Sequence, residues 1–373
     1  MKKSILVALA SLSVGAMLVS GCTTASECPA NPNCVAKACP AKTCAAKADC
    51  KAKAKCCFKQ TNCPYGNWAL YLPYDRMNAG HLILSKDEQG NSKSLLLWRW
   101  ASPYAQESVK IEGDTFVIAD KTRKPKGKEN DKSAWRTRVI TGKVSGCKAT
   151  CKLEVKDGNE KVISTEYFMG KRNPPMCPAP DLSKAVYGEP IDIIAAGMNG
   201  FTLMEPEARN GWSIKDGILS NRIARDENGK PKHGNGNIRT KRSDFYDFKL
   251  TYDVKVLPGC NSGMYIRGIY EIQVIDSYGK KVDCHNMAAF YGRITPSVAA
   301  EKPANEWQKV EVVLWKRHVT VTLNGVKIID NAPVEGITGG AMTPNEFVPG
   351  PLYIQGDHSD ADYRNLILTP ILN

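Results

Sequence analysis

A glutamate and a glutamine stand two residues apart in a mostly apolar, β-branched run, Tyr270 to Ile275. Such a run is typical of a buried strand, and the two-residue period of a strand directs Glu271 and Gln273 to the same face. Burying a carboxylate and an amide without partners costs several kcal/mol, so these groups are either paired structurally or face a polar cleft. Arg267, just upstream, is the expected partner of Glu271. A buried ion pair that only holds the sheet together is the alternative.

The third acidic residue of this stretch, Asp276, completes the pattern Glu271-x-Gln273-x-x-Asp276. This spacing resembles the Glu-x-Asp-x-x-Glu motif of laminarinase-like jelly-roll glycosidases. Regular pleating would point Glu271 and Asp276 to opposite faces, so a β-bulge is required if they are to cooperate. Retaining glycosidases use two carboxyl groups about 5–5.5 Å apart. Because Gln273 replaces the central Asp and Asp276 is shorter than Glu, ordinary retaining hydrolysis is disfavoured.

The strands that must position these residues are indicated by alternation. Residues 247–256 alternate cleanly, and Asn324-Gly325 within residues 318–330 is the favoured pair for a type I′ hairpin turn. No long amphipathic helix is evident between residues 177 and 373. This segment is therefore expected to form an all-β sandwich of the jelly-roll type.

A smaller β domain is expected over residues 65–176, where short strand-like runs are separated by turns containing Gly or Asp. The spacing predicts an antiparallel barrel or sandwich. Four tryptophans, at positions 68, 98, 100 and 135, either form a sugar-binding face or belong to the core. Cys147 and Cys151 flank a hairpin end and could bridge. The Pro-rich segment 173–180 marks the boundary with the second domain.

The net charge of +13 is local rather than general. Lysines cluster in residues 23–63, and a second basic run covers residues 121–143. Both are expected to be solvated or surface-adhering segments. Because no nucleic-acid-binding motif accompanies them, no nucleic-acid partner is predicted.

The N-terminus predicts export. Lys2-Lys3 precedes an apolar segment that ends in Leu18-Val19-Ser20-Gly21-Cys22. This ending resembles the bacterial lipobox, which implies a signal peptide over residues 1–21, lipidation of Cys22 and anchoring by acyl chains in the cell envelope, with the outer membrane favoured. Residues 22–64 are rich in Cys, Lys and Ala and are predicted to form a tether. Its cysteines are expected to form disulfides, with metal binding as the less favoured alternative.

The second domain carries a resemblance over about residues 190–373. The matching motifs are Gly211-Trp212, Asn261-Ser262-Gly263, Ile266-Arg267, Tyr270 to Asp276, Glu306-Trp307, Leu323-Asn324-Gly325, Gln355 to His358 and Tyr363-Arg364-Asn365. Together they resemble the 3-keto-disaccharide hydrolase family. The resemblance implies a concanavalin A-like jelly roll and cleavage of 3-keto-glycosides by a 1,2-lyase coupled to a hydratase. One departure is the altered stretch after Met198-Asn199-Gly200-Phe201.

The implied chemistry needs a base at C2, groups that stabilise the developing oxyanion, and an acid for the leaving oxygen. Glu271 and His358 are expected to act as base and acid, with Asp276 as a further catalytic candidate and Arg267 as a clamp. The expected substrate-binding residues are Asn261, Gln273, Gln355 and Tyr291. No cofactor is predicted with certainty, but Asp357 and His358 could bind a divalent metal together with Asp276 or Glu271.

Two functional classes remain open. The first is an envelope lipoprotein that acts on oxidised (3-keto) glycosides supplied by an upstream glycoside 3-oxidoreductase. The second is a non-catalytic carbohydrate-binding lipoprotein, because a jelly roll does not fix function. A structural surface protein is a third, plainer interpretation. A bridge between Cys260 and Cys284, which flank the site strands, is also expected.

Overall fold

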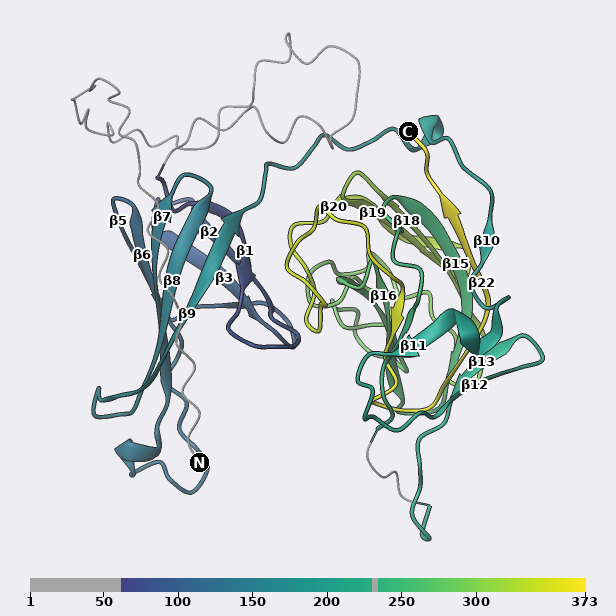
Figure 1. Ribbon diagram of the computed structural model, residues 1–373, viewed down its shortest axis with the longest axis horizontal. Coiled ribbons are helices and arrows are strands. Elements are labelled where there is room, and N and C mark those ends of the chain that lie inside the picture. Colours follow the sequence, from purple (N-terminus) through teal and green to yellow (C-terminus); the bar gives the residue numbers. More distant parts are fainter. Residues whose placement is uncertain (1–61, 230–233) are drawn as a thin grey trace, which may run out of the picture. The chain divides into compact units, whose positions relative to one another are not determined.

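The computed structural model describes residues 62–229 and 234–373, and these residues form β-sheets joined by loops (Figure 1). In this described part of the chain, regular helix is limited to three short 3-10 turns: Lys132–Ala134, Leu182–Lys184 and Gly197–Gly200. Within these ranges no helix is long and apolar enough to cross a membrane. The predicted signal peptide, Cys22 and nearly all of the predicted tether lie outside the described residues.

The first nine strands make one antiparallel sheet in the order β4-β3-β2-β1-β9-β8-β7-β6-β5. Their bounds are β1 Gly66–Tyr71, β2 Ala79–Lys86, β3 Ser92–Trp98, β4 Tyr104–Ala105, β5 Ser108–Glu112, β6 Thr115–Ala119, β7 Thr137–Ser145, β8 Lys148–Lys156 and β9 Val162–Arg172. The short strands separated by turns that the sequence predicts for this part of the chain are present.

One face of this sheet supplies a core of alternating apolar side chains, including Trp68, Leu70, Leu82, Leu96, Phe116, Ile140 and Leu153. Any Cβ at Gly142 would collide with the ring of Phe116, so the glycine lets that ring lie across the sheet. Trp68 is fully buried, whereas Trp100 is 52% exposed, so the four tryptophans do not share one role.

The expected bridge between Cys147 and Cys151 is not formed, and both thiols are free. Cys151 lies on β8 with its side chain buried in the core, while Cys147 is exposed in the turn between β7 and β8. Burial raises the pKa of the Cys151 thiol to about 12. Since the thiolate is the reactive form, Cys151 is an inert core residue.

The second part of the chain is a sandwich of two antiparallel sheets, and Figure 1 marks both with their strand labels. The larger sheet has the order β12-β13-β22-β15-β18-β19-β20, with β10 also paired to β22. Its strands are β10 Ile191–Asp192, β12 Trp212–Lys215, β13 Ile218–Asn221, β15 Phe248–Val256, β18 Gln308–Trp315, β19 His318–Leu323, β20 Val326–Pro333 and β22 Ala361–Pro370. The smaller sheet, β11-β14-β21-β16-β17, contains β11 Phe201–Leu203, β14 Ile238–Thr240, β16 Asn261–Ile266, β17 Tyr270–Ile275 and β21 Tyr353–Ile354.

Apolar side chains from both sheets meet in one core. β15 contributes every second residue, from Phe248 to Val256, and the burial of its side chains alternates along the whole strand. Met264, Ile272 and Val274 from the smaller sheet join the same core. The predicted hairpin turn is present, with positive φ at Asn324 and Gly325 (51° and 85°), as a type I′ turn requires. The jelly-roll sandwich expected from the sequence is confirmed.

Candidate functional site

The hairpin of β16 and β17 determines which side chains share the free face of the smaller sheet. Its register pairs residues directly across the two strands: Tyr265 with Glu271, Gly263 with Gln273, and Asn261 with Ile275. Directly opposed residues point to the same side of a sheet. Since Met264 and Ile272 point into the core, the face that carries Glu271 and Gln273 is the one turned away from it.

Glu271 lies in a space that exists because the residue diagonally across the hairpin, Gly263, is a glycine. The side chain is 3% exposed, and a Cβ at Gly263 would collide with its carboxyl oxygen Oε1. The same Cβ would lie 2.9 Å from Oε1 of Gln355. The missing side chain at Gly263 therefore allows the Glu271 carboxyl and the Gln355 amide to converge.

Burial controls the protonation of Glu271. It raises the pKa of this carboxyl to about 8, because removal from water disfavours the charged form. The hydroxyl of Tyr265, 2.8 Å from Oε2, and the charge of His358 oppose this rise, while the charge of Asp357 adds to it. Glu271 is therefore mainly protonated at neutral pH and can deliver a proton, as a general acid must.

Tyr265 connects this carboxyl to the rest of the face. Its hydroxyl lies 2.6 Å from the carbonyl oxygen of Gly339 and accepts a hydrogen bond from Nε2 of Gln355 at 3.1 Å. A carbonyl only accepts and a phenol has one proton, so Tyr265 can donate to Gly339 while Glu271 is protonated and turn its proton to Oε2 once Glu271 is ionised, which stabilises the carboxylate. The Tyr265 ring stacks on Tyr353 with a centroid distance of 4.1 Å, which fixes its position.

A second titratable group approaches from the loop after β21. Nδ1 of His358 lies 2.6 Å from Oδ1 of Asp357, and both side chains are about half-exposed. This hydrogen bond is the main reason that the pKa of His358 is raised; burial opposes it, and the charges of Asp357 and Glu271 add to it. The structure thus brings His358 within electrostatic range of Glu271, although 86 positions separate them in the sequence.

Among the described residues, two buried amide oxygens on this face have no hydrogen-bond partner: Oδ1 of Asn261 and Oε1 of Gln355. Buried polar atoms are almost always paired, so these acceptors suit a ligand that brings hydroxyl groups. Gln273 differs, because its Oε1 already accepts from the backbone N–H of Val274 at 2.9 Å. Burial and the charge of Glu271 raise the pKa of Tyr291, which places its phenol near the carboxyl.

Arg267 does not pair with Glu271 as expected. Its Nη2 donates to the backbone carbonyls of Glu346, at 2.8 Å, and Val348. The guanidinium also lies 4.3 Å from the ring centroid of Tyr246. Arg267 occupies the turn before β17 with φ of 55° and is 2% exposed, so its charge is engaged with the 346–348 segment rather than with the site.

Asp276 also stays apart from Glu271. The pairing of β16 with β17 runs from Ile266↔Tyr270 to Asn261↔Ile275 without the bulge that cooperation would need. In this regular register Glu271 and Asp276 point to opposite faces. Oδ2 of Asp276 instead accepts from the backbone N–H of Gly259 at 2.9 Å, so its carboxyl fastens the end of the hairpin.

The expected metal group around Asp357 and His358 is not found in residues 62–229 and 234–373. The group of three possible ligands found there is Asp283, Cys284 and His285, whose ligand atoms all lie within 4.8 Å of one another. The expected bridge between Cys260 and Cys284 is absent as well, since both thiols are free.

Sequence reasoning missed Tyr265 and Tyr353, which hold the carboxyl and the amide in place. Tyr265 could have been found from the hairpin register, because a three-residue turn, Arg267 to Ile269, sets Tyr265 opposite Glu271. Nothing in the local sequence indicates that Tyr353 stacks on Tyr265.

Residues 196–369 match the family model described as a 3-keto-alpha-glucoside-1,2-lyase-like domain. This part of the chain belongs to that family. The match contains every strand of the smaller sheet and all the site residues above. The resemblance predicted from the motifs is thereby confirmed, and we refer to this part as the lyase-like domain.

The names of several solved structures that are similar to the chain refer to carbohydrates. A candidate glycosyl hydrolase from Parabacteroides distasonis is 22% identical and covers 46% of this chain and 79% of its own, with a TM-score of 0.36. The carbohydrate-binding module CBM66 from Bacillus subtilis is 14% identical, covers 45% and 93%, and has a TM-score of 0.29. The LamA protein of Zobellia galactanivorans, solved with laminaritriose and laminaritetraose, is 10% identical, covers 49% and 98%, and has a TM-score of 0.32. No curated protein matches the chain.

A separate hollow of about 890 Å³ lies against the first sheet. Its lining includes the basic side chains of Lys121, Arg123, Lys126, Lys128, Arg136 and Arg138, with Asp120 and Asp131 as the acidic ones. It lacks the buried carboxyl and the unpaired amide oxygens that converge at Gly263. We therefore place the candidate site on the smaller sheet of the lyase-like domain.

Proposed function

We propose that the lyase-like domain cleaves 3-keto-glycosides by 1,2-elimination followed by hydration, which amounts to net hydrolysis. The observation that carries this proposal is the pairing of two unlike groups. Glu271 is a buried carboxylic acid with a pKa raised to about 8, and His358 is a half-exposed imidazole bonded to Asp357. An elimination needs one group that takes a proton and another that gives one, and an imidazole near a protonated carboxylic acid can supply both.

In this mechanism His358 is the base. The ketone at C3 acidifies the C2–H bond, because the resulting carbanion delocalises into an enolate. When Nδ1 of His358 donates to Asp357, Nε2 carries the free lone pair and can accept the C2 proton. Asp357 then stabilises the imidazolium that forms.

Glu271 is the acid. As the bond between C1 and the glycosidic oxygen breaks, Glu271 gives its proton to that oxygen, and a 2-hydroxy-3-keto-glycal and an alcohol result. The second half returns both protons: water adds at C1 and loses a proton to the Glu271 carboxylate, while His358 returns a proton to C2. The unpaired oxygens of Asn261 and Gln355 are suited to sugar hydroxyls, and the Tyr291 phenol is suited to the enolate oxygen.

The test is release of a chromogenic alcohol from a 3-keto-glucoside and from its unoxidised parent. Wild type is expected to act on the keto substrate alone, and the Glu271→Gln and His358→Ala variants are expected to lose this activity. Asp276→Asn is the matched control, because its carboxylate lies at the hairpin end. Release from the parent glycoside by wild type would instead indicate a conventional glycosidase.

A non-catalytic carbohydrate-binding function is the second candidate, and the unpaired amide oxygens of Asn261 and Gln355 favour it as much as they favour the enzyme. Under this alternative neither substrate releases alcohol. Saturable sugar binding would then survive Glu271→Gln and His358→Ala and be lost in Asn261→Ala.

The proposed setting is the cell envelope, with the chain held by acyl groups on Cys22 and with an oxidoreductase supplying the 3-keto group. The support is the sequence that ends at Cys22 and the chemistry, since elimination requires a substrate already oxidised at C3. Metabolic labelling with a palmitate analogue should mark wild type and fail to mark Cys22→Ser. Equal labelling of both chains would contradict the anchor.

A further inference from the structure

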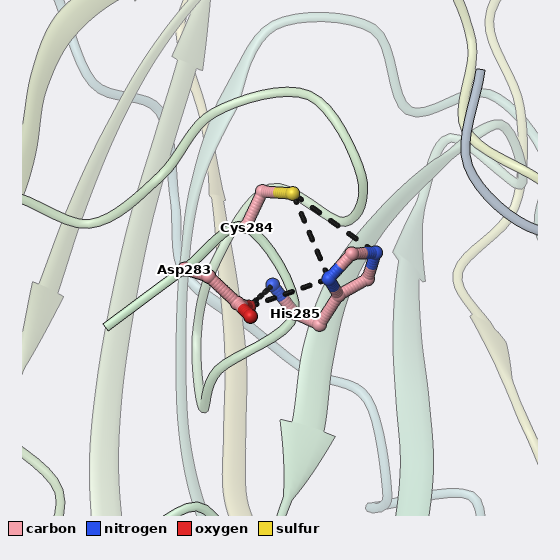
Figure 2. Close-up of side chains that lie close together, drawn as sticks. All are labelled: Asp283, Cys284 and His285. Carbon is pink, nitrogen blue, oxygen red and sulfur yellow. Dashed lines mark hydrogen bonds and ion pairs between the residues drawn. The ribbon is translucent and has the colours of Figure 1, made fainter. Parts of the chain in front are cut away.

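Three side chains with different donor atoms meet on the loop that follows β17, next to Tyr291, whose ring centroid lies 5.2 Å from that of His285. Figure 2 shows Asp283, Cys284 and His285 turned toward one another. Oδ1 of Asp283 lies 3.3 Å from Nδ1 of His285, and Sγ of Cys284 lies 3.7 Å from the same nitrogen. His285 and Asp283 are about half-exposed, so the group is open to solvent on one side.

Two of these separations match those between the ligands of a tetrahedral metal site. Zinc binds nitrogen at about 2.0–2.1 Å, carboxylate oxygen at about 2.0–2.2 Å and thiolate sulfur at about 2.3 Å. With tetrahedral angles, such bonds place nitrogen and oxygen about 3.4 Å apart and nitrogen and sulfur about 3.6 Å apart. The oxygen and sulfur distances measured from Nδ1 of His285 agree with these values. Sγ also lies 3.9 Å from Nε2, over the ring, so the imidazole has to turn about its Cβ–Cγ bond for the Nδ1 lone pair to share an ion with Sγ.

The second ring nitrogen of His285 has a partner that would orient a metal ligand. Nε2 lies 2.7 Å from Oγ of Ser102. When Nε2–H donates to this hydroxyl, the ring is in the tautomer that leaves the Nδ1 lone pair free for a metal ion. Metal-binding histidines almost always hold their other N–H in this way.

The loop backbone keeps the three residues in place. The N–H of His285 donates to Oδ1 of Asp283 at 2.7 Å, and the N–H of Gly292 donates to the carbonyl of Cys284 at 2.9 Å. An ionised carboxylate has about four acceptor positions, so Asp283 can hold the backbone N–H and still bind an ion.

We propose that Asp283, Cys284 and His285 bind one divalent metal ion of the zinc class, with the fourth position open to solvent. The mixed sulfur, nitrogen and oxygen donors suit a borderline ion such as Zn²⁺ rather than Ca²⁺ or Mg²⁺, which take oxygen ligands. The alternative is a loop fastened only by hydrogen bonds, including a weak contact from the Cys284 thiol to the imidazole. This proposal does not rest on the proposed glycoside cleavage, although the ring of His285 packs edge to face with that of Tyr291.

Cobalt(II) added to the reduced full chain is the probe. Cysteines in residues 22–63 can also bind cobalt, but that segment contains no histidine. The readout is therefore the exchangeable imidazole proton of a cobalt-bound histidine, seen as a hyperfine-shifted NMR resonance. Wild type should show one such resonance, His285→Ala should lose it, and the control Cys260→Ser should keep it.

Two further variants sharpen the result. Cys284→Ser should weaken binding and remove one equivalent of the thiolate-to-cobalt charge-transfer absorption. Ser102→Ala should keep the same ligands but bind about 10–100-fold more weakly, the usual effect of losing the group that orients a metal-binding histidine. Absence of the shifted resonance in wild type at saturating cobalt, or its persistence in His285→Ala, would overturn the proposal.

Discussion

Two buried glutamates in the described part of the lyase-like domain, Glu346 and Glu271, differ in how many hydrogen bonds their carboxyl groups make. Glu346 is fully buried, yet its carboxylate receives hydrogen bonds from four sides: Tyr270 at 2.9 Å, Asn173 at 2.6 Å, the N–H of Gly336 at 3.1 Å and Arg317 at 3.3 Å. Within the described residues the Glu271 carboxyl bonds to one hydroxyl, that of Tyr265.

The number and charge of the donors separate a structural carboxylate from a reactive one. A cation and several N–H or O–H groups compensate Glu346 for the water it has lost. Glu271 lacks such compensation, so its charged form is disfavoured and its proton is retained. Burial alone therefore does not identify a catalytic acid; burial with few donors does.

The largest expected effect is on catalysis by Glu271→Gln. Losing a general acid should reduce the rate of keto-glycoside cleavage about 10²–10⁴-fold. The free energy of unfolding at neutral pH should not fall, because Gln, unlike Glu271, takes up no proton on folding. Kinetics on the 3-keto-glucoside and chemical denaturation would measure the two quantities. A Glu271→Gln chain that keeps full activity would remove Glu271 from the mechanism.

The opposite pattern is expected for Glu346→Gln. This change leaves the Arg317 cation buried without its carboxylate, and breaking a buried ion pair in this way costs about 3–5 kcal/mol. The midpoint of urea unfolding should fall accordingly, with Glu271→Gln as the control. A loss below about 1 kcal/mol would mean that the network around Glu346 does not depend on its charge.

Stability should also depend on pH through Glu271. The folded pKa of about 8 lies above the ordinary value of 4.5, so the unfolded chain loses this proton first as pH rises. The contribution of Glu271 is thus most favourable below pH 4.5 and declines by about 1.4 kcal/mol per pH unit up to pH 8. The difference in unfolding free energy between wild type and Glu271→Gln, measured across this range, should have that slope. A flat difference would contradict the raised pKa.

The smallest effect is expected from Tyr265→Phe. The Tyr265 hydroxyl holds the pKa of Glu271 down, so its removal should raise that pKa further and move the alkaline limb of the kcat/KM profile to higher pH. The direct cost of the lost hydrogen bond is about 1 kcal/mol. Tyr278→Phe, at a position 57% exposed, is the control that should leave the limb in place.

The sequence predicted those parts of the site that depend on local geometry. The period of a strand placed Glu271 and Gln273 on one face, and the Asn324-Gly325 turn was recognisable by itself. Contacts made over long sequence separations were not predictable in the same way. The separation between Glu271 and His358 was bridged by family resemblance, not by periodicity. The partner assigned to Arg267 was wrong, because a turn residue can reach carbonyl groups on another loop.

Asp276 and Glu346 also show that strand pairing and contacts between distant segments could not be predicted from the sequence. Asp276 was given a catalytic role on spacing alone, but the bulge that this role needs depends on strand pairing that a single sequence does not reveal. Glu346 gave no signal, because its partners come from three distant segments, around residues 173, 270 and 317.

The position of β22 determines when the lyase-like domain can complete its folding during synthesis. β22 pairs with β13, β15 and β10, so it lies inside the larger sheet although it is the last strand in chain order. A growing or translocating chain can assemble β1 to β9 once residue 172 is available, but β15 lacks one of its two neighbours until residues 361–370 arrive. The lyase-like domain therefore becomes native only after its C-terminal strand has been delivered, and before that its apolar strands depend on protection from aggregation.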